Sequence, residues 1–504
     1  MKTHSIHAGA VADRGRMLVA AIALLAGGLA TPPAARAAEL SIAREPEIYQ
    51  AVEKLDAAGY LPGFAASTRP YPLSSVRDAV DNALASGDLP SDGFDRKLAD
   101  WLAWYLAPRS EGRAGAGFSL TDRPGAPPLA DGVPVPHGGS LFASGAFRAE
   151  PAAWFSAQAS GAAFLADGDA RGTRLLDTSV EAGWPFLSVE AGKISTWYGP
   201  GRNGALIFTN NAAPYPGVRL HNARPIAMPG LLSFLGTFRY DLFVARLEDD
   251  RPVPHPLLSG VRLSIRPSRY LEIGASRAMQ YGGRGEPSGP SAWWTAFKGT
   301  HDNEPGSTGN QESGFDVAVN LPFRLQPVRL YLEAAGEDEA TIKELNHLPV
   351  PSKWAFLGGI FLPSVFGSSR ADLRLEWAAN HLSGNGPSWY VHGHHPESYR
   401  GRILGHPMGT DARQLDLTGH WYFLPSTYLE LSLGSLRRYS PGGPQVESTV
   451  RTGAGLVGWL TENLRAEGRF GSERIRNAEG FGGEGRTDLS FSAMLAWRVA
   501  DGGQ

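Results

Sequence analysis

Apolar and polar residues alternate one by one over most of the chain beyond about residue 140. In residues 328–334 the even positions are all apolar, whereas Arg329, Tyr331 and Glu333 occupy the odd positions. The same alternation is found in residues 372–379, 414–423, 463–470 and 489–499. Successive side chains of a β-strand point to opposite faces, so this pattern predicts strands with one apolar and one polar face.

The connections between these strands fall into two classes. Short links join strand pairs, and long polar loops separate the pairs. The short links are at 267–269, 325–327, 424–426 and 460–462, and the long loops are near 281–312, 337–351, 381–411, 438–447 and 472–486. Short turns at one end and long loops at the other are typical of outer-membrane barrels. We therefore predict a mainly β fold, an outer-membrane antiparallel β-barrel of about 16–18 strands over residues 138–500. Residues 195–250 could contain a further strand pair whose alternation is less clear.

A closed barrel also agrees with the low hydropathy of the chain. Every backbone N–H and C=O group must be paired inside a bilayer, and a closed sheet achieves this without edges. Only the outward face of the sheet must be apolar, which is consistent with a mean hydropathy of −0.21. Aromatic residues near strand ends are predicted to lie at the membrane interfaces, namely Trp184, Tyr270, Trp421, Tyr422 and Trp459.

The start of the chain predicts export. The basic residues Lys2, Arg14 and Arg16 precede an apolar run over 17–30, and Ala35-Arg36-Ala37 has the form of a cleavage site. We therefore interpret residues 1–37 as a secretory signal peptide.

Residues 38–108 show helical rather than strand periodicity. Apolar residues recur at helical spacing in three stretches: Ile48, Val52 and Leu55; Val76, Val80 and Leu84; and Phe94, Leu98, Trp101, Leu102 and Tyr105. Ser74 is the expected N-cap of the second helix, which ends at Gly87. The pattern predicts a small periplasmic α-helical bundle over 38–108 and a Gly/Pro-rich connector over 109–137. The chain ends in residues 501–504 without the aromatic residue that commonly closes such barrels.

Composition excludes several classes of function. A net charge of −3 without a basic stripe argues against nucleic acid as a partner. The absence of cysteine excludes a disulfide framework and thiolate chemistry. Four histidines lie close in sequence, but they lack the spacing of a zinc motif, so we expect no metal and no cofactor: His392, His394, His395 and His406.

Carboxylates in the loops raise the question of catalysis. Glu337 and Asp338 are adjacent on a predicted strand and therefore point to opposite faces, which prevents them from acting together on one glycosidic bond. A partner such as Glu397 or Asp411 stays open at this level. No nucleophile elbow and no phosphate-binding glycine loop is present in the sequence.

Three segments depart from the strand pattern and carry unusual residues. Trp197-Tyr198-Gly199-Pro200 leads into Asn210-Asn211-Ala212-Ala213-Pro214, Gly336-Glu337-Asp338 ends a strand, and Tyr399-Arg400-Gly401-Arg402 leads to Gly405-His406-Pro407-Met408-Gly409-Thr410-Asp411. Each motif is short, but the ordered set resembles the capsule-assembly Wzi family from about residue 39 to the C-terminus. The resemblance implies an outer-membrane barrel of around eighteen strands with a periplasmic helical bundle. It also implies a lectin-like role in organising capsular polysaccharide at the cell surface.

The loop residues themselves suit a carbohydrate ligand. Trp and Tyr cover the apolar C–H faces of a sugar ring, while Asn, Asp, Arg and His pair with its hydroxyl groups. The competing role for each is to pack loop against loop inside the barrel. The candidate carbohydrate-binding residues are Trp197, Tyr198, Arg202, Asn203, Asn210, Asn211, Trp293, Trp294, Trp389, Tyr390, His392, Tyr399, Arg400 and Asp411.

Together these features favour a non-catalytic, lectin-like protein of the cell outer membrane. Its expected partners are capsular polysaccharide or exopolysaccharide and the surrounding outer-membrane lipid, and the helical bundle is a candidate contact for periplasmic export or assembly proteins. Two alternatives remain: an outer-membrane channel for small solutes, and a membrane glycan-modifying enzyme.

Overall fold

The computed structural model describes residues 38–501, with gaps at 126, 168–170, 300–308, 324, 343–347, 383–388 and 441. For residues 338–342 and 348–352 it describes the backbone alone, so the side chain of Asp338 is outside its scope. The predicted signal peptide and residues 502–504 of the predicted tail also lie outside the described residues.

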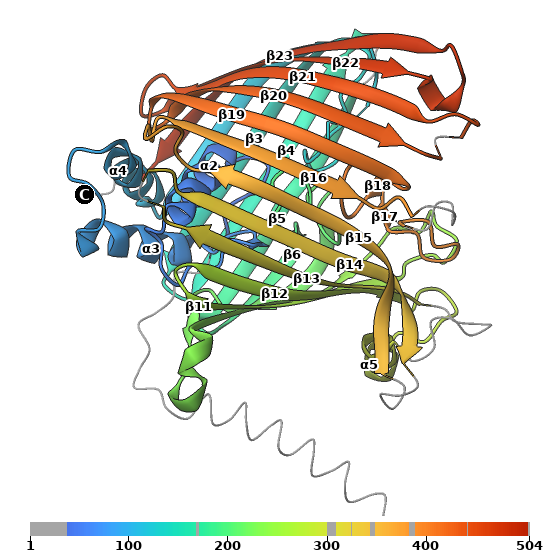
Figure 1. Cartoon of the computed structure of the whole chain (residues 1–504), viewed down its shortest axis with the longest axis horizontal. Helices are drawn as coiled ribbons and strands as arrows, with labels where there is room; N and C mark the ends of the chain where they lie inside the picture. The colour runs from blue at the N-terminus through green and yellow to red at the C-terminus, as the bar shows by residue number, and fades with distance from the viewer. Residues whose placement is uncertain are drawn as a thin grey trace, which may run out of the picture. The chain divides into compact units, whose positions relative to one another are not determined.

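In the described part of the chain, 18 antiparallel strands form a closed barrel whose first strand is hydrogen-bonded to its last (Figure 1). The sheet has no free edge, as a membrane-spanning sheet requires. This confirms the predicted fold class. The strands are β2 (Ser110–Thr121), β3 (Gly138–Ala152), β4 (Phe155–Ala166), β5 (Arg171–Trp184), β6 (Leu187–Ile194), β8 (Tyr215–His221), β10 (Thr237–Arg246), β11 (Leu257–Ser268), β12 (Leu271–Tyr281), β13 (Asn310–Leu321), β14 (Val328–Ile342), β15 (Leu348–Leu362), β16 (Ala371–Ala379), β19 (Ala412–Leu424), β20 (Thr427–Arg438), β21 (Glu447–Trp459), β22 (Leu464–Arg476) and β23 (Gly485–Ala500).

The two ends of the barrel differ in the length of their connections, as the sequence predicts. At the turn end, residues 269–270 join β11 to β12 and residues 425–426 join β19 to β20. At the loop end, residues 195–214 lie between β6 and β8, and residues 380–411 lie between β16 and β19. The strand pair expected within 195–250 is β8 and β10, which the short β9 (Ile226–Ala227) and the 3-10 helix η2 (Gly230–Leu235) connect.

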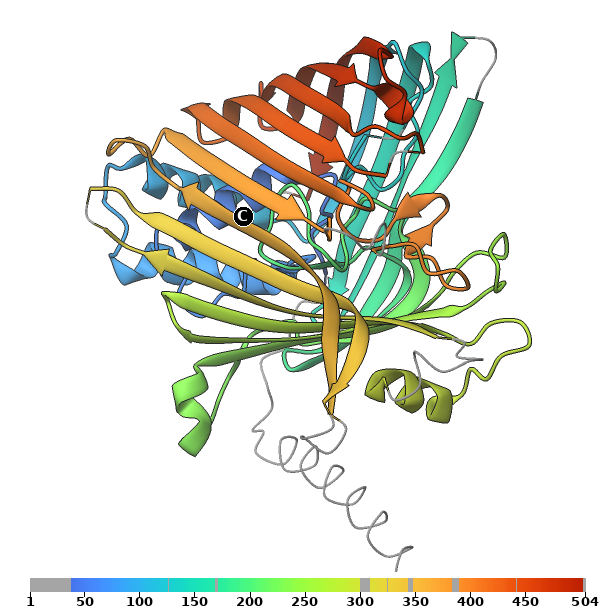
Figure 2. The same cartoon turned by 45° about the vertical axis from the view of Figure 1, so that its right-hand side comes forward.

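Two predicted boundaries are wrong. The connector expected at 109–137 contains β2, so the barrel begins at Ser110 instead of residue 138. Glycines made this strand resemble a loop, yet Gly117 is required by packing, because a Cβ there would lie 2.5 Å from the ring of Phe142 on β3. The loop expected at 337–351 is mostly strand, because β14 and β15 continue as a pair that projects beyond the wall (yellow in Figure 2).

The barrel wall is apolar outside and polar inside. On β14, Leu332 is 48% exposed on the outward face, whereas Arg329 and Glu333 are buried on the lumenal face. On β20, Leu431 and Leu433 are likewise exposed. An exposed apolar face that continues from strand to strand is stable only against lipid, so the strands span a membrane.

Among the residues that the structure describes, no helix combines the length and the apolarity needed to cross a bilayer.

The predicted interfacial aromatics divide into two groups. Trp184, Tyr270 and Trp421 are exposed on the outward face near the turn end, as expected. The prediction is wrong for Tyr422 and Trp459, which are buried. Both point into the lumen because strand alternation places them opposite their outward neighbours, and there Tyr422 packs on the ring of Phe94 and Trp459 on that of Tyr105, with centroids 5.4 and 5.8 Å apart.

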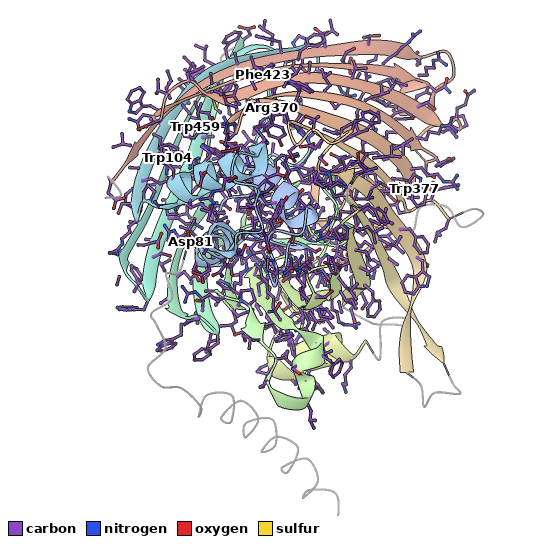
Figure 3. The ribbon with its side chains drawn as sticks, turned by 60° about the vertical axis from the view of Figure 1, so that its left-hand side comes forward. Asp81, Trp104, Arg370, Trp377, Phe423 and Trp459 are labelled. Atoms are coloured by element: carbon purple, nitrogen blue, oxygen red, sulfur yellow. The ribbon has the colours of Figure 1, made fainter. Side chains whose placement is uncertain are left out.

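The predicted N-terminal helices are α2 (Pro46–Ala57), α3 (Leu73–Ser86) and α4 (Phe94–Leu106), and they lie at the turn end (Figure 3). The expected N-cap role of Ser74 is wrong, because α3 begins at Leu73 after Pro72, and the Ser74 hydroxyl instead donates to the Ala223 carbonyl oxygen. The three helices share one apolar core with the base of the barrel.

Helix α2 sits within the barrel and is buried on its polar as well as its apolar side. Its carboxylates pair with arginines of the inner wall: Glu47 with Arg465 at 2.9 Å, Glu53 with Arg374 at 2.8 Å, and Asp56 with Arg266 at 2.6 Å. Charged side chains on the inner faces of strands far apart around the wall therefore hold this helix in place as a plug.

Candidate functional site

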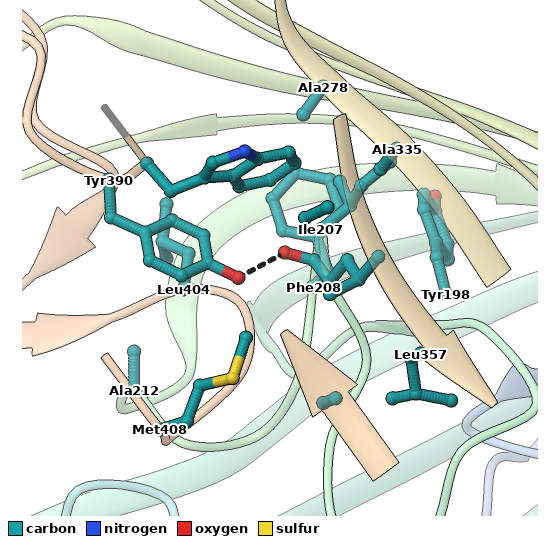
Figure 4. Packing of buried hydrophobic residues seen from close by; sticks show 14 of the residues in the cluster. Tyr198, Ile207, Phe208, Ala212, Ala278, Ala335, Leu357, Tyr390, Leu404 and Met408 are labelled. Carbon is teal, nitrogen blue, oxygen red and sulfur yellow. Dashed lines mark hydrogen bonds between the residues drawn. The ribbon is translucent and has the colours of Figure 1, made fainter. Parts of the chain in front are cut away.

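Two long loops of the loop end turn inward and pack in the lumen. Residues 195–214 and 389–411 share a buried apolar cluster with the wall strands β10–β16 (Figure 4). The Tyr390 hydroxyl donates to the Leu206 carbonyl oxygen at 2.6 Å and accepts from the His406 backbone N–H at 3.0 Å. These bonds tie one loop to the other.

Wall carboxylates fix the backbone of the first loop. Glu376 on β16 accepts from the backbone N–H groups of Arg202 and Asn203, each at 2.8 Å, and Glu333 on β14 accepts from that of Leu206 at 2.8 Å. The hydroxyl of Tyr331 also donates to Glu376, at 2.7 Å. Because the backbone carries these contacts, the side chains of Arg202 and Asn203 remain available for other partners.

Asparagines join three loops. The Asn210 side chain donates to the Leu129 carbonyl oxygen at 2.8 Å, and that of Asn211 donates to the Ile403 carbonyl oxygen at 2.9 Å. Arg402 in turn donates to the Asn211 side-chain oxygen at 3.0 Å. The Asn-Asn motif therefore links the first loop to the β2–β3 loop and to the 389–411 loop.

Six of the predicted binding residues pack inside the protein. They are at most 5% exposed, and their polar atoms meet protein partners; for example, Trp389 donates its indole N–H to the Lys353 carbonyl oxygen at 2.6 Å, and Asp411 lies 2.6 Å from the His381 ring. Residues packed and paired in this way hold the loops together. They are Tyr198, Asn211, Trp389, Tyr390, Tyr399 and Asp411.

Short strand pairs stiffen these loops. β7 (Trp197–Tyr198) pairs with β1 (Thr68–Arg69) between the first loop and the helical segment, and β17 (Ser398–Tyr399) pairs with β18 (Arg402–Ile403) in the second loop. Between the last two, Arg400 has φ 49° and is exposed, and its backbone N–H donates to Glu248 at 3.1 Å. His392, a further predicted residue in the same loop, is half-buried.

Trp293 and Trp294 lie on α5 (Pro290–Lys298), which packs on the outward side of β11 and β12. The Trp293 indole donates to Ser259 on β11 at 3.0 Å, and the ring of Trp294 is 52% exposed. This position is outside the wall near its loop end, where tryptophan is favoured at a membrane–water boundary. The pair is therefore separated by the wall from the lumenal loops that carry the other predicted residues.

A cavity of about 750 Å³ lies elsewhere in the lumen. The inner faces of β2, β3 and β19–β23, the start of α2, and the loop residues 127–133 surround it. Four predicted residues lie on its lining: Trp197, Arg202, Asn203 and Asn210. A cavity of this size is within the range of ligand pockets, which is about 300–1,000 Å³.

Sequence reasoning missed most of the cavity lining. Arg44, Gln414, Trp459 and Arg465 belong to no motif, and three of them are inward positions of ordinary strands. The alternation of polar and apolar residues marked such positions as lumenal, but it did not indicate which strands face an open space and which face packed loops.

The loop histidines and carboxylates do not gather into a cluster of metal ligands in the described residues. No three His, Asp or Glu side chains among them come together as metal ligands. Burial lowers the pKa of His406 to about 3, so the ring is neutral, and its Nδ1 accepts from the Met408 backbone N–H. Burial raises the pKa of Glu397 to about 7, against hydrogen bonds that lower it, and Asn310 donates to this carboxyl at 2.6 Å. Glu337 accepts from the Tyr390 backbone N–H, and neither glutamate lines the cavity.

The model of the capsule assembly protein Wzi family matches residues 125–488. The chain belongs to this family. An uncharacterised 55.8 kDa protein in the cps region of Klebsiella pneumoniae is 36% identical over 175 residues, which is 34% of this chain and 33% of that protein. The alignment thus spans about a third of the length of this curated relative.

A solved structure has the same fold. It is that of Wzi from Escherichia coli, described as an outer-membrane protein involved in group 1 capsule assembly and as a carbohydrate-binding β-barrel. The match covers 91% of this chain and 99% of that one, with 20% identity and a TM-score of 0.71. Together with the lipid-facing band of the barrel, membership of the Wzi family places the chain in the outer membrane.

Proposed function

We propose that the chain is a non-catalytic carbohydrate-binding protein that helps to assemble capsular polysaccharide on the cell surface. One observation carries this proposal: a barrel whose lumen is occupied by packed loops and a helical plug still keeps a cavity of about 750 Å³ whose lining includes tryptophan, asparagine and arginine. The similarity to Wzi from Escherichia coli, a carbohydrate-binding barrel involved in capsule assembly, supports it.

The cavity side chains match the chemistry of a sugar. Trp197 and Trp459 offer indole rings, and Asn203, Asn210 and Gln414 offer amide groups for hydroxyls. Outside the lumen, the exposed surface of the 389–411 loop, including His392 and Arg400, is the place where a polymer first meets the protein. We expect binding to involve both regions.

A channel for small solutes fits this architecture less well. The 195–214 and 389–411 loops pack into the lumen as a buried apolar cluster, and α2 is ion-paired to the wall at the turn end. A porin keeps an open aqueous path instead.

Catalysis also has little support. The carboxylates considered for a glycosidase, Glu337, Glu397 and Asp411, are buried among packed loop residues and lie off the cavity lining. A glycosidase needs two carboxyl groups that flank an accessible sugar bond. Incubation with the native polysaccharide is expected to produce no new chain ends.

The deciding experiment compares cells with and without the gene for this chain. We expect deletion to shift polysaccharide from the cell-bound to the released fraction, and the wild-type chain to restore attachment. Complementation with Asp100→Asn, a change in an exposed helix ion pair, serves as a matched control and should restore attachment fully. Unchanged attachment after deletion, with no retention of the polymer by purified protein, would refute the proposed function.

The helical segment is also proposed to contact periplasmic export or assembly proteins. Support comes from its position at the turn end and from the exposed side chains on the outer faces of α3 and α4, such as Asp81 and Trp104 (Figure 3). Crosslinking from an introduced cysteine at Asp81 tests this contact.

A further inference from the structure

The lining of the lumenal cavity is rich in arginine. Nine arginines and four carboxylates lie on its lining in the described part of the chain. Most of these arginines are already paired: Arg374 with Glu53 at 2.8 Å, Arg465 with Glu47 at 2.9 Å, and Arg469 with Glu430 at 2.9 Å are typical.

Two guanidinium groups on the lining have only distant carboxylates. Arg44 comes no closer than 3.9 Å to Asp177, and Arg202 no closer than 3.7 Å to Glu53. Both are partly accessible, with 22% and 23% of their side chains exposed. They also lie near each other in the fold, because Arg44 is two residues before Pro46, the first residue of α2, and Arg202 donates to the carbonyl oxygen of Pro46.

Buried polar groups on the same lining lack protein partners. The indole N–H groups of Trp197 and Trp459 have no hydrogen-bond acceptor in the described residues, although both side chains are more than 90% buried. The side-chain carbonyl oxygen of Gln414 and the side-chain amide nitrogen of Asn203 are also buried without a hydrogen-bond partner in the described residues. Buried polar groups without partners are costly, so a ligand or water must meet them.

The rings are held in place for such a contact. Arg69 lies over the Trp197 ring, 4.7 Å from its centroid, and Tyr105 meets the Trp459 ring edge to face at 5.8 Å. Each indole is therefore fixed by a neighbour, while its N–H has no hydrogen-bond partner in the described residues.

We propose that this cavity binds an acidic saccharide, with Arg44 and Arg202 pairing with its carboxylate and the indole N–H groups of Trp197 and Trp459 donating to its ring and hydroxyl oxygens. This inference rests on the proposed carbohydrate-binding function and adds the charge of the ligand and its place inside the barrel. Guanidinium groups suit carboxylates because the two can form paired hydrogen bonds.

The test uses full-length protein in detergent and short oligosaccharides released by partial hydrolysis of the surface polysaccharide of cells that make the protein. A second batch of the same oligosaccharides has its carboxyl groups chemically reduced to alcohols. Affinity is measured by calorimetric titration. We expect the wild type to bind the native oligosaccharides at least about tenfold more tightly than the reduced ones, as for loss of a charge-assisted contact.

Substitutions then locate the site. Arg202→Gln and Arg44→Gln should each weaken binding of the native oligosaccharides about tenfold and have little effect on the reduced ones. Folding is not expected to suffer in Arg202→Gln, because the backbone N–H of this residue makes the contact with Glu376. Heat-dependent gel mobility of each variant checks that the barrel is formed. Trp294→Ala, on the outside of the wall, is the matched control and should bind as the wild type does.

The outcomes separate the two proposals. Equal affinity for native and reduced oligosaccharides would reject the preference for an acidic ligand. Wild-type affinity in both folded arginine variants would reject the cavity as the place of binding. In either case the proposed carbohydrate function would stand. No binding of either oligosaccharide by the wild type would reject both.

Discussion

Glu53 shows how one residue decides the position of the plug. Its carboxylate pairs with Arg69 and Arg374, each at 2.8 Å, and Arg202 lies 3.7 Å away. Burial alone would raise the pKa of this carboxyl, but the surrounding arginines outweigh burial and lower the pKa to about 2. The group is therefore charged at every physiological pH, and its partners depend on that charge.

The substitution Glu53→Gln leaves two buried guanidinium groups without a counter-charge. Removing one partner of a buried ion pair typically costs about 3–5 kcal/mol, so we expect a loss of this size in the free energy of unfolding. Chemical unfolding followed by tryptophan fluorescence measures it. Asp100→Asn, which breaks an exposed pair with Arg96, should cost less than about 1 kcal/mol. Equal effects of the two substitutions would contradict the role given to Glu53.

Lowering the pH should weaken the ion pairs of Glu53 over a defined pH range. The folded pKa of Glu53 is about 2 and lies below the unfolded value of about 4.3. The stabilisation is therefore fully present above pH ~4.3 and is lost as the pH falls toward 2. We expect the difference in unfolding free energy between wild type and Glu53→Gln to be constant at pH 5–8 and to shrink below pH ~4. A difference that already shrinks between pH 7 and 5 would show that another group controls it.

The sequence indicated only part of this residue-level picture. The motifs located Trp197, Arg202 and Asn203 among the candidate residues, and the structure places all three at the cavity. Glu53 and Arg44 gave no signal, because helical periodicity identifies the apolar stripe of α2 and treats the charged side as solvent-exposed. That side is buried because the barrel supplies arginines from strands distant in sequence.

At the level of elements, strand alternation was a reliable guide to the two faces of the wall. It failed where side chains are small, as in β2, and where an aromatic residue near a strand end faces inward, as for Tyr422 and Trp459. In both cases the missing information is the packing of a neighbour: Phe142 on Gly117, and the helices on the two aromatic rings.

If the outward face of the wall contacts lipid, the energetic cost of placing a charge on it depends on the depth of that position in the bilayer. Leu433 lies in the middle of β20 and Leu424 at the turn end of β19, and both are exposed outward. Leu433→Arg should cost about 2–4 kcal/mol of stability in a bilayer, and Leu424→Arg only about 0–1 kcal/mol. Reversible unfolding from lipid vesicles measures both values. Equal small costs would argue that the outward face does not contact hydrocarbon.

At the scale of the whole molecule, the lumen is divided. Loops fill the side lined by β10–β16, the cavity occupies the side lined by β2, β3 and β19–β23, and the helices close the turn end. The sequence predicted a barrel, a helical segment and long loops. It contained no signal for this division, because the division depends on contacts between segments about 200 residues apart, such as Tyr390 with Leu206.

This arrangement predicts an electrically closed barrel, because the packed loops and the ion-paired α2 both obstruct the lumen. In planar bilayers we expect the wild type to show no steady porin-like conductance. Replacing residues 195–214 and 389–411 by short Gly-Ser linkers removes both loops that pack in the lumen, but the ion-paired α2 remains at the turn end, so conductance should stay low. Adding Glu53→Gln to that variant weakens the second obstruction, and only the combination should give frequent openings. Steady conductance of the wild type would show instead that the cavity is continuous through the barrel, and the channel alternative would then be favoured.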